Sequence, residues 1–185
     1  DGTTLAGEAI AALRARLERG EVASGEGRYR IHDVGGAYLD RITHDVKLAR
    51  PMRVAVDCGN GVAGAYAPTL FRRLGCDVVE LYCEVDGRFP NHHPDPSQPG
   101  NLTDLVARLA EGDCELGLAF DGDGDRLVVV TRDGHVIWPD RQLMLHAADV
   151  LARVPGATVI YDVKSTRNLG PWIARHGGRP LLWKT

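Results

Sequence analysis

Three aspartates alternate with glycines in the segment Phe-Asp-Gly-Asp-Gly-Asp-Arg, which ends at Arg126. The carboxylates of Asp121, Asp123 and Asp125 would repel one another if all three were ionised with no cation between them. A hard divalent cation with oxygen ligands, Mg²⁺ in particular, removes that repulsion, and the intervening glycines allow the backbone to turn tightly. The guanidinium of Arg126 follows directly and could contact an anion beside the metal. The segment therefore predicts a metal site in preference to a simple polar turn.

Two known aspartate patterns fit this segment less well. In haloacid-dehalogenase-type phosphatases an aspartate nucleophile is followed two residues later by an aspartate acid, and Mg²⁺ assists. Asp121 and Asp123 would take those roles, but Asp125 and the hairpin after it would then have no explanation. The calcium-binding EF-hand pattern fails because Arg126 and Arg132 stand where it needs glycine and glutamate.

A second glycine-rich segment, residues 59–64, matches the Gly-x-Gly-x-x-Gly pattern of dinucleotide-binding loops and lies between an expected strand and helix. Glu80 stands about where that pattern places an acidic ribose ligand. Two features weaken the match, because Asp57 puts negative charge beside the pyrophosphate position and Glu80 falls inside an expected strand. Close packing of the strand against the helix explains the glycines adequately, so we favour it over a nucleotide site.

Two further segments carry polar side chains that could line a site. Residues 84–100 form a long irregular segment that holds four of the ten prolines. We expect a rigid, proline-braced loop with hydrogen-bonding side chains, because adjacent histidines such as His92 and His93 make a poor metal pair. Lys164 follows an expected strand, where a lysine could meet a phosphate or a sugar hydroxyl; the alternative is a solvated surface lysine.

The elements around these segments alternate between strands and helices. Strands are expected at Arg53–Cys58, Asp77–Tyr82, Glu115–Phe120, Leu127–Thr131 and His135–Trp138, the last two joined by the tight-turn pair Asp133-Gly134. The order predicts an α/β fold with a mixed, mainly parallel sheet covered by helices on both faces. The aspartates then lie beyond the C-terminal end of a strand, where open α/β sheets bind their ligands.

A second, incomplete α/β unit is expected from Pro139 onward. It contains a helix at Arg141–Arg153, a strand at Thr158–Val163, a helix at Arg167–His176 and a strand from Pro180. Such a half-domain cannot bury both faces of its sheet, so we expect the chain to be cut inside this second domain.

Composition narrows the classes of function. The 185 residues carry a net charge of -3, which gives no electrostatic reason to expect nucleic acid or an anionic membrane as partner. No apolar run approaches the roughly 20 residues of a membrane span. The four cysteines form no Cys-x-x-Cys pair and lie in or beside apolar segments, as is typical of a cytoplasmic protein with reduced thiols.

Six segments, taken in order, resemble the α-D-phosphohexomutase superfamily, and in particular its bacterial phosphomannomutase/phosphoglucomutase branch. They are Asp57–Gly61, Tyr82–Gly87, Phe89–Pro96, Asp121–Arg126, Trp138–Arg141 and Asp162–Arg167. Members of that family have four domains around one cleft. The resemblance implies that residues 1–32 are the tail of domain 1, residues 33–138 the metal-binding domain 2, and residues 139–185 the start of the sugar-binding domain 3.

The resemblance also implies an activity, the interconversion of hexose 1-phosphate and hexose 6-phosphate of glucose or mannose through a bisphosphorylated sugar. Asp121, Asp123 and Asp125 match the ligands of Mg²⁺, which also binds a phosphoserine contributed by domain 1. Arg126 matches the active-site arginine beside them, and Lys164 matches a lysine that lines the substrate site. The phosphoserine loop, the sugar-recognition loop and the phosphate-binding domain 4 have no counterpart in these residues.

From that resemblance we expect a chain of these residues alone to be inactive and to bind Mg²⁺ weakly. Its partners would be the phosphosugar and the missing domains of the same protein, with no nucleic acid or membrane involved. The alternatives are a haloacid-dehalogenase-type phosphatase that uses Asp121, and a non-catalytic metal- or nucleotide-binding module.

Overall fold

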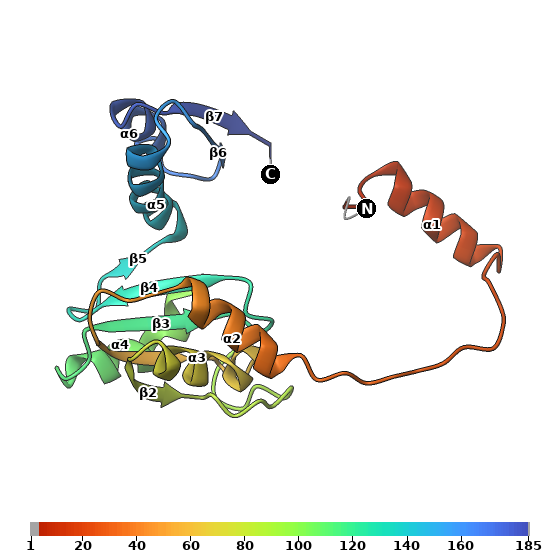
Figure 1. Ribbon diagram of the computed structural model, residues 1–185, viewed down its shortest axis with the longest axis horizontal. Helices are drawn as coiled ribbons and strands as arrows, with labels where there is room; N and C mark the ends of the chain where they lie inside the picture. Colours follow the sequence, from red (N-terminus) through yellow and green to blue (C-terminus); the bar gives the residue numbers. More distant parts are fainter. Residues whose placement is uncertain (1–3, 185) are drawn as a thin grey trace. The chain divides into compact units, whose positions relative to one another are not determined.

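The computed structural model describes residues 4–184, so residues 1–3 and 185, at the ends of the predicted segments 1–32 and 139–185, lie outside the description. The chain divides between Val34 and Gly35 into two compact units. In residues 4–34, the described part of the first unit, there is one helix, α1 (Glu8–Glu18), and none of its residues is buried (Figure 1). The boundaries predicted at 32/33 and 138/139 remain predictions.

The second unit is built on a five-stranded sheet in the order β2-β1-β3-β4-β5. Strand β1 (Arg53–Asp57) pairs in parallel with β2 (Asp77–Leu81) on one side and with β3 (Leu116–Phe120) on the other. Strand β4 (Leu127–Thr131) runs antiparallel to both β3 and β5 (Val136–Ile137). The predicted mixed sheet is therefore confirmed, with three parallel strands extended by the antiparallel β4–β5 hairpin.

Strand β5 is two residues shorter than the prediction of His135–Trp138. His135 closes the hairpin turn, where its carbonyl accepts a hydrogen bond from the backbone N–H of Thr131 at 2.9 Å. Trp138 is extended, but it already caps the next helix, whose first residue is Pro139. Proline has no backbone N–H to donate and holds the residue before it extended, so the strand cannot continue across this point.

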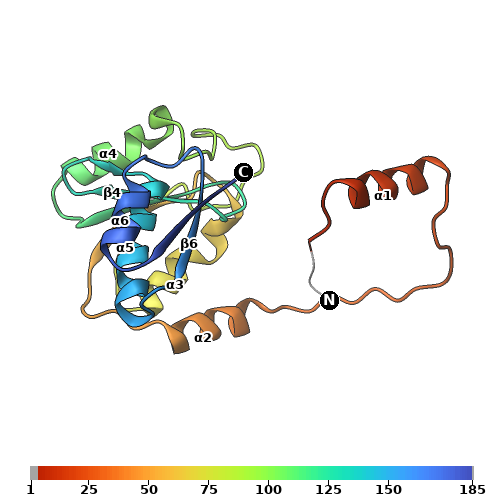
Figure 2. The same cartoon turned by 90° about the horizontal axis from the view of Figure 1, so that it is seen from above.

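Side chains of β1 alternate between the two faces of the sheet. Both faces therefore carry apolar residues, and helices cover both. Ala55 faces one side, where it packs with Leu105 and Leu109 of α4 (Thr103–Ala110). Val54 and Val56 face the other side, beneath α3 (Ala67–Arg73). Figure 2 shows α3 and α4 on opposite sides of the sheet. The other helices described in this part of the chain are α2 (Gly35–Asp45) and the 3₁₀ helices η1 (Val62–Ala65) and η2 (Pro99–Leu102).

A second, two-stranded parallel sheet is formed by β6 (Thr158–Asp162) and β7 (Arg179–Trp183). The helices of this part of the chain are α5 (Pro139–Arg153) and α6 (Leu169–Arg175). Four buried residues form the small core of this part: Ala147, Leu151, Leu169 and Ile173. Every residue of β7 is exposed, whereas Val159 and Tyr161 of β6 pack against this core.

The structure bears on two features of the composition, the cysteines and the length of the apolar segments. Cys58, Cys76 and Cys114 are buried, Cys83 is half-buried, and all four are free thiols. No helix in the described part of the chain is long and apolar enough to cross a membrane.

Candidate metal centre

The three aspartates lie on the hairpin loop that connects β3 to β4. Phe120 and Leu127 are paired across the two strands, so residues 121–126 form the whole connection. The backbone N–H of Asp121 donates to the carbonyl of Arg126 at 3.3 Å, and the N–H of Gly124 donates to the carbonyl of Asp121 at 3.2 Å. Gly124 has a φ of +76°, which only glycine adopts without strain. The loop is thus closed on itself.

This loop brings the predicted metal ligands together. One carboxylate oxygen from each of Asp121, Asp123 and Asp125 lies within 4.8 Å of the other two. Asp121 is buried, whereas Asp123 and Asp125 are exposed. The pKa of Asp125 is raised because its carboxyl group hydrogen-bonds Asp121 and faces the charge of Asp123. Crowded hard oxygen donors of this kind fit a divalent cation such as Mg²⁺.

Arg126 holds the buried member of the group. Its backbone N–H donates to Oδ1 of Asp121 at 3.1 Å, and its Nε donates to Oδ2 at 2.7 Å. Burial alone would raise the pKa of Asp121, but these hydrogen bonds outweigh burial and hold the pKa below its ordinary value. The carboxylate of Asp121 is therefore ionised, and Arg126 fixes its orientation.

The proline-braced loop lies directly beside the aspartates. The carbonyl of Pro94 accepts the N–H of Gly122 at 3.1 Å. The carboxylate of Asp95 accepts a hydrogen bond from Nη1 of Arg126 at 3.0 Å. Residues 91–97 of the proline-braced loop thus contact both the backbone and the cationic side chain of residues 121–126, the metal loop.

The same loop is tied to the end of strand β1. Nε2 of His92 lies 3.1 Å from each carboxylate oxygen of the buried Asp57. The amide of Asn91 donates to Oδ1 of Asn60 at 2.8 Å. Burial raises the pKa of Asp57, and hydrogen bonds from the N–H of Gly59 and from His92 partly offset that effect. The Pro-Asn-His-His-Pro segment is therefore a bridge between β1 and the metal loop.

The glycine-rich segment 59–64 is explained by close approach of backbones. A Cβ on Gly61 would lie 2.7 Å from the carbonyl oxygen of Gly122, and a Cβ on Gly64 would overlap the carbonyl oxygen of Cys83. The N–H of Val62 also donates to the carbonyl of Gly122 at 3.0 Å. The glycines bring this segment against the metal loop and the end of β2, so no nucleotide is needed to explain them.

Lys164 lies apart from the aspartates, just after β6. Its side chain is 70% exposed, and its Nζ is 3.4 Å from a carboxylate oxygen of Asp162. It lines a cavity of about 850 Å³ together with Ser97, Trp138 and Pro139. These three residues also line a smaller hollow of about 250 Å³ that contains Arg126. The two hollows therefore adjoin, with Lys164 in one and Arg126 in the other.

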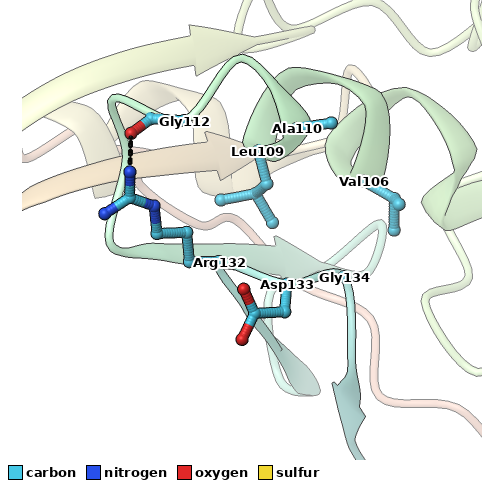
Figure 3. Close-up of a pocket in the computed structure, with 7 residues that line it drawn as sticks. All are labelled: Val106, Leu109, Ala110, Gly112, Arg132, Asp133 and Gly134. Atoms are coloured by element: carbon cyan, nitrogen blue, oxygen red, sulfur yellow. Dashed lines mark hydrogen bonds between the residues drawn. The ribbon is translucent and has the colours of Figure 1, made fainter.

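A third hollow, of about 300 Å³, lies at the opposite end of the sheet, between α4 and the hairpin turn of Asp133 and Gly134 (Figure 3). The guanidinium of Arg132 is directed at the carbonyl of Gly112, to which it donates at 2.5 Å. None of the predicted site residues lines this hollow.

Three residues that support the centre were not predicted as site residues from sequence: Asp57, Asp95 and Asn60. The composition of residues 84–100 indicated a braced loop with hydrogen-bonding side chains, which the structure has. That composition could not indicate that Asp95 would reach Arg126, 31 positions along the chain. Asn60 has a φ of 62°, a left-handed conformation that asparagine tolerates better than most residues.

The domain that carries the three aspartates matches a known protein family. Residues 36–134 match the family model described as phosphoglucomutase/phosphomannomutase, alpha/beta/alpha domain II. Over its full length the chain is 61% identical to a phosphoglucomutase of Neisseria gonorrhoeae and 56% identical to a phosphomannomutase/phosphoglucomutase of Pseudomonas aeruginosa. It spans 40% of the length of each of these relatives.

Solved structures agree with that match. A phosphoglucomutase/phosphomannomutase family protein from Burkholderia thailandensis superposes with a TM-score of 0.96 at 54% identity, covering all of this chain and 40% of the other. A phosphomannomutase described as putative, from Thermus thermophilus, superposes with a TM-score of 0.83 over all of this chain and 43% of its own. Its 23% identity supports the fold alone.

Proposed function

This chain belongs to the phosphoglucomutase/phosphomannomutase family, and on that premise we propose that the protein containing it is a Mg²⁺-dependent phosphohexomutase. It would interconvert hexose 1-phosphate and hexose 6-phosphate of glucose or mannose, through a phosphoserine and a bisphosphorylated sugar. The observation that carries the proposal is the group of three carboxylates within 4.8 Å, with Arg126 hydrogen-bonded beside them, in the domain that matches the family.

The donor set suits the chemistry of phosphoryl transfer. Asp121, Asp123 and Asp125 would hold Mg²⁺, which when bound neutralises charge on phosphate oxygens. The exposed edge of the Arg126 guanidinium would bind an anionic oxygen of the phosphosugar or phosphoserine. Lys164, on the other side of the adjoining hollows, would contact a phosphate or a hydroxyl of the sugar. Catalysis of this kind depends on positioning and charge stabilisation more than on covalent chemistry.

The proposed reaction also needs groups that we place outside residues 1–185. The chain spans 40% of the length of its curated relatives, and we place the phosphoserine and the second phosphate-binding loop in the remainder of the protein. A chain of residues 1–185 alone should therefore show no turnover and should bind Mg²⁺ more weakly than the full-length protein. The free thiols fit our proposal of a cytoplasmic enzyme.

A haloacid-dehalogenase-type phosphatase is disfavoured by the environment of Asp121. Its side chain is 3% exposed, and each of its two oxygens accepts a hydrogen bond from Arg126. A nucleophilic carboxylate would have to reach the phosphorus of a substrate, and this one is buried and held in place. Asp121 is better suited to be a fixed ligand.

The proposal is tested with the full-length protein in a coupled assay with glucose 1-phosphate or mannose 1-phosphate and catalytic amounts of the bisphosphate. We expect 6-phosphate to form, activity to disappear when EDTA removes the metal, and activity to return with Mg²⁺. Full activity in EDTA would contradict the metal requirement. Release of inorganic phosphate in place of 6-phosphate would favour the phosphatase.

A further inference from the structure

We propose that Asp95, on the proline-braced loop, is a positioning residue that fixes the guanidinium of Arg126 beside the three aspartates. The inference rests on the proposed function in one respect, since it takes Arg126 to be the group that binds the phosphosugar anion. It adds a residue that lies 31 positions away from Arg126 in sequence and 3.0 Å from it in space.

Asp95 is held in place by contacts that do not involve Arg126. Its Oδ1 accepts hydrogen bonds from the hydroxyl of Ser97 at 2.7 Å and from the backbone N–H of Ser97 at 3.2 Å. Its own N–H donates to the carbonyl of His93 at 2.8 Å, and its carbonyl accepts the amide of Asn101 at 2.9 Å. Prolines on both sides fix two further backbone dihedrals. The carboxylate is therefore preorganised.

The side chain of Arg126 depends on hydrogen-bond partners to fix its position more than the side chain of Asp95 does. Its side chain is long and 55% exposed, so it would sample many rotamers without partners. Nε donates to Asp121 and Nη1 donates to Asp95, so that two edges of the planar guanidinium are fixed by carboxylates. No hydrogen bond within residues 4–184 uses Nη2. The two anchors therefore aim the third nitrogen at an incoming anion.

The irregular segment 84–100 contains a natural control. Asp86 has the same side-chain exposure as Asp95, 22%, and accepts the N–H of the residue two positions later in the same way. It also pairs with an arginine, Arg88. The difference is the location of that arginine, because Arg88 is 87% exposed and belongs to the segment itself, not to the metal loop.

The kinetic test compares Asp95→Asn and Asp86→Asn in the full-length protein. Asparagine can keep the bonds to Ser97, but it replaces the ion pair between Asp95 and Arg126 with a weaker hydrogen bond from the guanidinium to a neutral acceptor. We expect Asp95→Asn to lower kcat/KM by about threefold to tenfold and Asp86→Asn to leave it unchanged. In an Arg126→Lys background, Asp95→Asn should cost less than about twofold. Equal losses in both backgrounds would mean that Asp95 acts through the fold, and would overturn the proposal.

A second readout does not depend on activity. Rotation of the Arg126 guanidinium, measured by ¹⁵N NMR of the arginine side chains, should be at least about threefold faster in Asp95→Asn than in the wild type. Asp86→Asn should not change it. Unchanged rotation would overturn the proposal whatever the kinetics show. If the wild-type protein has no mutase activity, the proposed function fails, and the NMR measurement alone decides whether Asp95 holds Arg126.

Discussion

Replacement of Gly61 by alanine tests how closely the glycine-rich segment supports the metal loop. Gly61 has a φ of -76°, so alanine can adopt the same backbone and any cost is steric. Its Cβ would lie 2.7 Å from the carbonyl oxygen of Gly122, 2.9 Å from the Cα of Gly122 and 3.1 Å from the carbonyl oxygen of Asp121. All three are backbone atoms, so no side-chain rotation relieves the contact.

The size of the effect follows from that overlap. The shortest contact is about 0.7 Å inside ordinary van der Waals distance, so the metal loop or the glycine segment must shift. Overpacking of this kind costs about 1–3 kcal/mol, equivalent to an increase of about 5- to 150-fold in the opening equilibrium. Mg²⁺ demands near-ideal geometry from its ligands, so we also expect its affinity to fall by about tenfold.

Hydrogen exchange in the full-length protein measures the first effect, because it reports on the amides of β1 and β3 separately from the rest of the chain. Isothermal titration with Mg²⁺ measures the second. Gly87→Ala is the matched control, since a Cβ there meets nothing within 4 Å; we expect a change within about 0.5 kcal/mol. If Gly61→Ala exchanges and binds Mg²⁺ like Gly87→Ala, the close contact does not support the metal loop.

Three further predictions concern other parts of the chain. Gly36→Ala should stabilise the protein by about 0.5–1 kcal/mol in a denaturant titration, because Gly36 lies inside α2 and its Cβ would meet no other atom within 4 Å; destabilisation would contradict this. The Arg108 guanidinium holds the pKa of Asp113 well below its usual range, so the pair stabilises fully above the ordinary aspartate pKa and its contribution is lost as pH falls through the lowered one. The stability difference between the wild type and Asp113→Asn should therefore shrink below about pH 4; a difference that grows there would refute the pairing. Lys164→Ala should raise KM for the phosphosugar by about tenfold without affecting thermal stability, since the side chain is 70% exposed; a KM equal to that of a Lys47→Ala control would remove Lys164 from the site.

Local sequence was sufficient for most of the sheet. The apolar runs Val54–Val56 and Leu116–Phe120 identify strands buried on both faces, and Asp133-Gly134 identifies the β4–β5 turn. The metal loop was recognisable because alternating carboxylates and glycines have few structural explanations other than a cation. These features depend on residues close together in sequence, where periodicity and spacing carry the information.

The support of the metal loop depends on contacts between distant segments. Gly61 meets Gly122, and Asp95 meets Arg126, only after the order of the strands brings their loops to one edge of the sheet. Sequence patterns alone allowed several explanations for the glycines, including a nucleotide site, because the same flexibility serves both purposes. Only the arrangement in space distinguishes a backbone that approaches a ligand from one that approaches another backbone.

The three clustered aspartates are proposed to bind the metal of a phosphohexomutase. This proposal is tested most directly by coupled assay of the full-length wild type, Asp123→Asn and Asp133→Asn with glucose 1-phosphate, Mg²⁺ and catalytic glucose 1,6-bisphosphate. Asp133 is a matched control, because it is also an exposed aspartate followed by glycine in a turn, at the opposite end of the sheet. We expect Asp123→Asn to lose activity by about 100-fold or more and Asp133→Asn to retain it. Robust activity in Asp123→Asn would contradict the metal site, and no activity in the wild type would contradict the function.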